Sequence, residues 1–182
     1  MEKTKRDHQI TVVSDTTPII SLMKIERLYL MKQLFDEVKL PEAVYMELVS
    51  NRQFEKERRQ IEESSFIKIV CVENNEAVDL LRKTTGLDKG ESEAIILSAS
   101  CGADLLLMDE VKGRLVAKQR GLHLMGTVGM LQAAHQEKLM SRKDIEACIN
   151  VLKANGRHIS DKLFQQLLDT IHPHYLNRII PA

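Results

Sequence analysis

Two acidic residues of this 182-residue chain stand directly after short runs that read as strands. Asp15 follows the β-branched run 10–14, and Asp109 follows the apolar run 105–108. Open α/β sheets bind ligands at the carboxyl ends of their strands, beside the helices that begin there. The two positions therefore predict an acidic site at this edge of a sheet. For each acid the alternative is a purely structural role as a helix N-cap.

Glu93 belongs to the stretch 86–99, which reads as a buried helix. Ile96 and Leu97 follow Glu93 at the i+3 and i+4 spacing, so the three side chains share one apolar face. An ionised carboxylate on such a face is costly unless a positive group meets it or its pKa shifts. The partner is therefore a metal ion, an Arg or a Lys, and we interpret Glu93 as a metal ligand.

Glu47 and Glu91 are further candidates at helix positions. Glu47 follows Val44 by three residues, so it lies on or beside the apolar stripe of its helix, or else marks the edge of that stripe. Asp88 and Glu91 have the spacing of a capping box, which gives Glu91 a structural role. Because Glu91 also lies in the first helical turn, it remains a reserve candidate for the same site.

The chemistry of such a site follows from its donor atoms. If Asp15, Glu47, Glu93 and Asp109 converge, four carboxylates cannot all stay ionised without cations. Oxygen ligands suit Mg²⁺ or Mn²⁺ rather than zinc, and the three cysteines are far apart with no CxxC motif. Ions held in this way cut phosphodiesters by activating a water and stabilising the leaving oxygen.

The elements that must position these acids alternate between strand and helix, which predicts an α/β fold with a parallel sheet. The charged segment 52–64 is expected to form a solvated helix or a mobile connection. The predicted strands cover residues 10–14, 38–40, 66–72, 104–109 and 122–125. The predicted helices begin after a Thr17 N-cap and at residues 28, 42, 76, 88, 110 and 127.

The end of the chain reads as a helical extension. Ser141 and Asp144 begin an amphipathic helix that ends before Gly156, and Ser160 caps another helix. The tail 174–180 is too apolar for a free end, so we expect it to pack on this molecule or on a second copy. We divide the chain into residues 1–140 and an extension, residues 141–182, packed on the same domain.

Formal net charge is zero, which argues against a strongly basic nucleic-acid binder or a polybasic membrane protein. The later part is nevertheless basic, with 11 Lys and Arg against 6 Asp and Glu after residue 109. Lys112, Arg114 and Lys118 lie there and are candidates for RNA contacts, or else form an exposed basic face. No run is long enough to cross a membrane, so we expect a soluble, cytoplasmic protein.

Four motifs of this sequence resemble a PIN domain, more narrowly the VapC-like prokaryotic subgroup. They are VVSDTTPII (12–20), LPEAVYMEL (40–48), GLDKGESEAIILSA (86–99) and ADLLLMDEVKGR (103–114). The resemblance implies a three-layer α/β/α fold and a metal-dependent single-strand endoribonuclease. It also implies catalytic roles for Asp15, Glu47, Glu93 and Asp109, with Thr16 as a neighbouring hydroxyl and Asp15, Glu93 and Asp109 on the metal.

The resemblance further implies a homodimer and, in toxin members, a small antitoxin partner. Many PIN domains have Thr or Ser two residues before the last acid, where this chain has Leu107. Together with the neutral net charge, Leu107 favours a second interpretation, a catalytically weak or inactive module for binding or regulation. A third, a phosphohydrolase with an aspartyl nucleophile, ranks low because such enzymes commonly need Asp where Thr17 stands.

Overall fold

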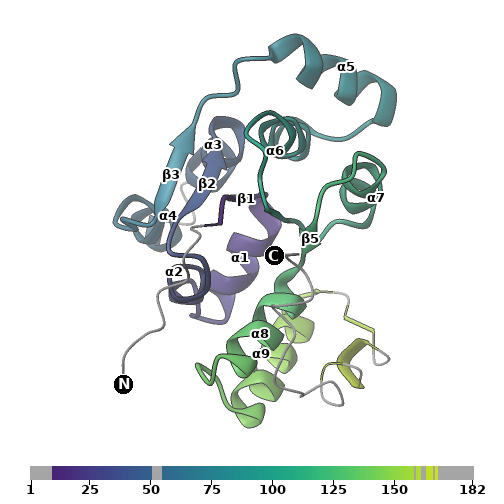
Figure 1. Cartoon of the computed structure of the whole chain (residues 1–182). Coiled ribbons are helices and arrows are strands. Elements are labelled where there is room, and N and C mark those ends of the chain that lie inside the picture. The colour runs from purple at the N-terminus through teal and green to yellow at the C-terminus, as the bar shows by residue number, and fades with distance from the viewer. Residues whose placement is uncertain (1–9, 51–54, 158, 161–162, 166, 168–182) are drawn as a thin grey trace.

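A five-stranded parallel sheet forms the centre of the protein (Figure 1). The computed structural model describes residues 10–50, 55–157, 159–160, 163–165 and 167. The strand order is β3-β2-β1-β4-β5, which confirms the predicted α/β class. The strands are β1 (Val12–Ser14), β2 (Val38–Pro41), β3 (Ile67–Val70), β4 (Leu105–Leu107) and β5 (Leu124–Met125).

Successive side chains of β1 and β4 point to opposite faces of the sheet, so the apolar core lies in two layers. Val12 of β1 and Leu105 of β4 face one buried cluster, whereas Val13 and Leu106 face the other. Successive side chains of a strand point to opposite faces, so apolar residues in sequence are buried on both sides. Helices cover each face, and the result is the three-layer α/β/α arrangement.

Helices α1, α2, α3, α4, α8 and α9 contribute to the first cluster, α4 through Ile61, and α5, α6 and α7 contribute to the second. The bounds of the first four helices are α1 (Thr16–Lys24), α2 (Tyr29–Phe35), α3 (Glu42–Ser50) and α4 (Glu55–Glu62). They are followed by α5 (Asn75–Thr85), α6 (Lys89–Ser100), α7 (Val111–Gln119), α8 (Thr127–Gln136) and α9 (Arg142–Ala154).

The register of β1 and β4 fixes where the first acid lies. Ser14 pairs with Leu107, and the next backbone N–H, that of Asp15, donates to the Leu107 carbonyl over 2.9 Å. Helix α1 begins at Thr16, with Asp15 in the N-cap position. The predicted Thr17 cap was wrong, because Thr17 already lies within the first helical turn. Asp15 leaves the sheet at the end of its middle strand.

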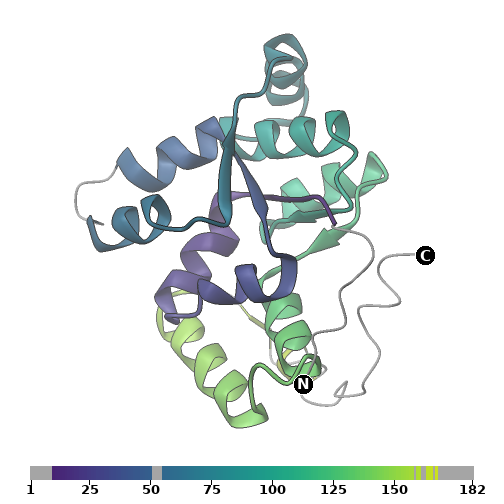
Figure 2. The same cartoon turned by 60° about the vertical axis from the view of Figure 1, so that its left-hand side comes forward.

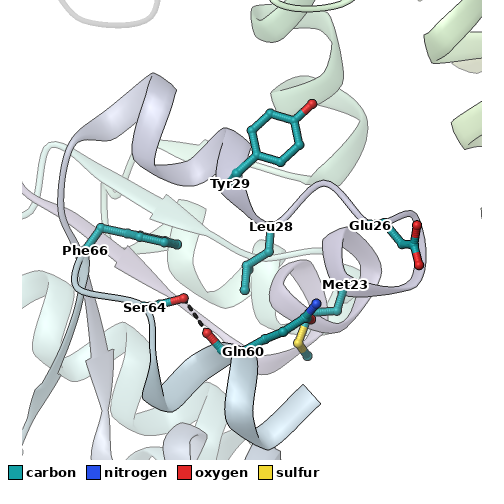
Figure 3. Close-up of a pocket in the computed structure, with 7 residues that line it drawn as sticks. All are labelled: Met23, Glu26, Leu28, Tyr29, Gln60, Ser64 and Phe66. Carbon is teal, nitrogen blue, oxygen red and sulfur yellow. Dashed lines mark hydrogen bonds between the residues drawn. The ribbon is translucent and has the colours of Figure 1, made fainter. Parts of the chain in front are cut away.

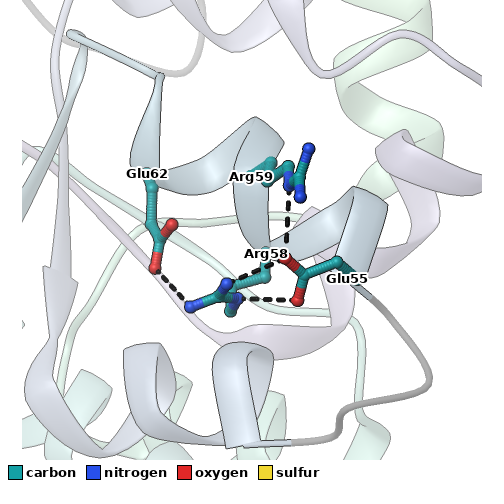
Figure 4. A network of polar contacts seen from close by, with 4 residues as sticks. All are labelled: Glu55, Arg58, Arg59 and Glu62. Atoms are coloured by element: carbon teal, nitrogen blue, oxygen red, sulfur yellow. Dashed lines mark hydrogen bonds and ion pairs between the residues drawn. The ribbon is translucent and has the colours of Figure 1, made fainter.

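Within the charged segment 52–64, residues Glu55–Glu62 form the short helix α4. Of the two structures expected there, the helix is the one observed. Arg58 bonds to Glu55 over 2.9 Å and to Glu62 over 3.3 Å, and Arg59 joins the same Glu55 carboxylate (Figure 4). These side chains are between 40% and 67% exposed. Exposed pairs of this spacing contribute little to folding stability, so α4 is a solvated helix without chemistry of its own.

Helix α9 packs beside α8 at one end of the molecule in both views (Figures 1 and 2). Its Ile145, Ile149 and Leu152 belong to the same buried cluster as the first face of the sheet. Ser160 accepts a capping hydrogen bond from the Leu163 N–H over 3.2 Å, as expected. The apolar tail 174–180 lies outside the described residues. No helix in the described part of the chain is long and apolar enough to cross a membrane.

Candidate functional site

Asp15 is a buried carboxylate surrounded by others. Its side chain is 2% exposed and makes no capping hydrogen bond to α1. Burial raises the pKa of Asp15 from 3.8 to about 7, against the opposing effect of the Thr16 N–H. The negative charges of Asp88, Glu91 and Glu47 raise the pKa further. Three acids from two other helical segments therefore raise the pKa of the carboxylate at the end of β1.

Glu47 reaches this group from α3. Its Oε2 accepts a hydrogen bond from Thr16 Oγ1 over 2.5 Å, which links the predicted hydroxyl to the predicted second acid. Desolvation raises the pKa of Glu47, the Thr16 hydroxyl lowers it, and Asp88 raises it. A Cβ on Gly90 would lie 2.7 Å from Glu47 Oε1. The Glu47 carboxylate therefore packs against the backbone of Gly90, which has no side chain, at the start of α6.

The start of α6 supplies two more acids through the predicted capping box, which is confirmed. Asp88 Oδ1 accepts the Glu91 N–H over 2.7 Å, and Glu91 Oε2 accepts the Asp88 N–H over 3.0 Å. Desolvation raises the pKa of Glu91, and the charges of Asp88 and Glu110 add to this. Sequence reasoning gave Asp88 only its capping role. The position of Asp88 directly before α6 could have indicated that its charge also belongs to the site.

Glu93 is buried as predicted, at 4% exposure, and its negative charge raises the pKa of Glu47. Its Oε2 accepts the N–H of Ala43 over 2.9 Å, and its Oε1 lies 3.5 Å from Lys89 Nζ. Ala43 is in the first turn of α3, so Glu93 satisfies a backbone donor that the helix itself leaves free. The carboxylate that acts on Asp15 from α6 is that of Glu91, the reserve candidate.

Asp109 lies after β4, beside the strand that carries Asp15, and its carboxylate is held by the start of α8. Oδ1 accepts the Thr127 N–H over 2.7 Å, and Oδ2 accepts the Thr127 hydroxyl over 2.5 Å. Gly126 leaves room for this contact, since a Cβ there would lie 2.7 Å from Oδ1. Asp109 does act as a cap, but for α8 rather than for the helix that follows it.

The hydroxyl missing at Leu107 is supplied from another element. Leu107 is fully buried in β4, where its side chain packs in the core. Thr127, which sequence reasoning did not single out, provides a hydroxyl to Asp109 instead. The only signal was its place at a predicted helix start after the last strand.

Two of the three candidate basic residues are tied to backbone carbonyls near the acids. Lys112 Nζ donates to Gly86 O over 2.9 Å, and Arg114 Nη1 donates to Met108 O over 2.7 Å. Lys118 is exposed on α7. Lys112 also lowers the pKa of Glu91, so one cation borders the acidic cluster formed by Asp15, Glu47, Asp88 and Glu91.

The donor chemistry of the acidic cluster fits a hard divalent cation, because every side-chain donor is a carboxylate or hydroxyl oxygen. Within the described residues, no three His, Cys, Asp or Glu side chains are arranged around one point that could hold a metal ion. Charge interactions nevertheless link Asp15 to Glu47, Asp88 and Glu91, and they link Glu47 to Glu93. Glu93 and Asp109 are directed at Ala43 and Thr127.

Two cavities are present among the described elements. One, of about 390 Å³, lies between the α1–α2 turn and α4, and none of the cluster acids lines it (Figure 3). Its wall is formed by Met23, Glu26, Leu28, Tyr29, Gln60, Ser64 and Phe66. The other, of about 590 Å³, adjoins Asp109 and the start of α8. The second cavity therefore adjoins the end of β4 through Asp109, although none of the cluster acids lines it either.

Comparison with known proteins adds one result. The sequence model of a family described as PIN domain matches residues 11–173, which include every strand and α9. The strand order 3-2-1-4-5 is typical of that fold. No curated protein matches the chain.

Proposed function

Because the chain belongs to the PIN-domain family, we propose that it is a metal-dependent endoribonuclease that cuts single-stranded RNA. PIN domains are typically nucleases and generally use divalent metals. The observation that carries the proposal is Asp15, which is buried among three other carboxylates and has a pKa raised to about 7. Such a carboxylate is stabilised in its ionised form when a divalent cation binds beside it.

In this proposal Asp15, Glu47 and Glu91 would draw together to hold Mg²⁺ or Mn²⁺, and Asp109 would border the site from the end of the neighbouring strand. The bound ion would activate a water and stabilise the leaving oxygen of a phosphodiester. Thr16 orients Glu47 through its hydroxyl, and Thr127 orients Asp109. Asp15 would hold the ion only as a carboxylate, because metal ligation requires the deprotonated form.

The test compares cleavage of a single-stranded RNA by the full chain in Mn²⁺, in Mg²⁺ and in EDTA. Wild type should cut only with metal, and Asp15→Asn should lose at least about 100-fold in rate, because it removes a charged metal ligand. Asp36→Asn is the matched control, since Asp36 is exposed and has φ 63°, which Asn tolerates. Cleavage in EDTA, or equal rates in wild type and Asp15→Asn, would contradict the proposal.

The second candidate function is a PIN-fold module that binds RNA without cutting it. It is favoured by the absence of a preformed three-ligand group among the described residues and by Asp109, whose two oxygens both bond to Thr127. Titration with Mn²⁺ separates the two functions. The module would bind RNA with no cleavage at any Mn²⁺ concentration, whereas the nuclease would gain activity as the ion binds.

The toxin role, the homodimer and the antitoxin partner extend this proposal and need separate experiments. Growth arrest on expression of wild type, but not of Asp15→Asn, would support a toxin that acts through the acidic cluster. Light scattering of the purified chain measures the oligomeric state. We further propose that Lys112, Arg114 and Lys118 contact the RNA backbone, since α7 presents them beside the acids.

A further inference from the structure

The cavity of about 590 Å³ beside Asp109 has the size and location of a ligand site. Its lining residues come from α7, β5, α8, the end of α9 and the described residues after it, near the end of β4. Part of its wall is aliphatic, with side chains such as Leu124, Val128, Leu152 and Ile159. Arg114, Gln132 and Arg157 place polar groups on the same wall, which also includes the carboxylates of Asp109 and Glu110.

Arg157 has hydrogen-bonding capacity that the described residues do not use. Its Nε is buried and has no hydrogen-bond partner among them, although its Nη1 forms a long ion pair with Glu110 Oε1 over 4.0 Å. A buried donor without an acceptor is unfavourable, and more so when it is charged. An acceptor group that enters the cavity would remove this cost.

Arg114 adds a second guanidinium in a fixed position. Its Nη1 bonds to the Met108 carbonyl over 2.7 Å and would lie 3.4 Å from a Cβ on Gly126. One nitrogen therefore anchors the group, while the guanidinium fork lines the cavity. Two guanidiniums on one wall are complementary to a phosphate.

We infer that this cavity binds one nucleotide of the RNA strand, with its phosphate at Arg114 and Arg157 and its nucleoside against the aliphatic wall. The inference rests on the proposed function for the identity of the strand. Because Asp109 follows β4, which pairs with β1, a nucleotide here lies at the strand end next to the one that carries Asp15. A base must be unpaired to enter a cavity, so the same site selects single-stranded RNA.

The inference is tested by binding of uridine 5′-monophosphate to the full chain in EDTA, measured by calorimetry. Arg157→Gln should weaken binding by about 10-fold or more, because it removes a charge-assisted contact. Arg120→Gln, at an exposed arginine on the far end of α7, should leave it unchanged. Thermal melting shows whether both variants are folded. Uridine and inorganic phosphate are the two partial ligands, and each should bind more weakly than the nucleotide.

Equal nucleotide binding by wild type and Arg157→Gln would overturn the inference, as would no binding at millimolar concentration. Phosphate binding as tightly as the nucleotide would also overturn it, since the cavity wall would then contribute nothing. Under cleavage conditions Arg157→Gln should raise KM with little change in kcat. Nucleotide binding is measured without metal, so it can be observed even if the protein does not cleave RNA. Metal-dependent cleavage without nucleotide binding would instead refute the cavity site alone.

Discussion

Asp109 and Thr127 are joined by two hydrogen bonds across 18 residues of sequence. The backbone N–H of Thr127 donates to one carboxylate oxygen over 2.7 Å, and its hydroxyl donates to the other over 2.5 Å. The pair connects the end of β4 to the start of α8. It also decides the direction of Asp109, because both oxygens are turned toward the helix.

Thr127→Val tests this link, because it removes the hydroxyl and keeps the shape and the backbone N–H. We expect a loss of about 1 kcal/mol in unfolding free energy and a lower rate of RNA cleavage, because one carboxylate oxygen loses its donor. Denaturant unfolding and a cleavage assay measure the two effects. Thr127→Ser retains the hydroxyl and should behave like wild type in cleavage. Equal cleavage by all three proteins would show that the hydroxyl does not position Asp109.

Asp15 should make the metal-free protein less stable as the pH rises. Its folded pKa is about 7 against an ordinary value of 3.8, so between these pH values the native state binds the proton more tightly than the unfolded state. The contribution to stability is full below about pH 4 and is lost as the pH passes about 7. The difference amounts to at most about 4 kcal/mol.

Unfolding by urea in EDTA, followed by circular dichroism from pH 4 to pH 8, measures this effect. Asp15→Asn should be more stable than wild type above pH 7, and the advantage should shrink toward pH 4. Asp36→Asn should follow the wild-type profile. A constant difference between wild type and Asp15→Asn across the range would argue against the raised pKa.

Glu91→Gln should weaken Mn²⁺ binding more than Glu93→Gln does. Glu91 belongs to the group of charges that act on Asp15, whereas Glu93 accepts from Ala43 and lies near Lys89. Interpretation of the sequence alone favoured the opposite order, because only the burial of Glu93 was visible there. Calorimetric titration with Mn²⁺ measures the affinities, and the opposite ranking would restore Glu93 as the metal ligand.

Gly90→Ala should separate activity from stability. The new Cβ would lie 2.7 Å from Glu47 Oε1, so that carboxylate must move away from Thr16. Alanine is the better helix former by up to about 1 kcal/mol, so the melting temperature should stay equal or rise. Metal-dependent cleavage should fall. Ser100→Ala, at an exposed position on the last turn of the same helix, is the control and should cleave like wild type.

The periodic parts of the fold were predictable from the sequence. The apolar strand run at Leu105–Leu107, the capping box of α6 and the glycine after α9 all occur where local patterns placed them. These features depend on neighbours within about four residues, which a sequence displays directly. Motif resemblance added the family, and the family match confirms it.

The acids themselves could also be identified in the sequence, because burying a carboxylate on an apolar face or after a buried strand costs free energy and is therefore unusual. Their directions were not, since each depends on a partner far along the chain. Glu93 meets Ala43 across 50 residues, and Asp109 meets Thr127 across 18. The sequence predicted acids at the carboxyl edge of a parallel sheet. Only the tertiary structure decided which of them face Asp15, because long-range packing sets where each side chain finds its donor.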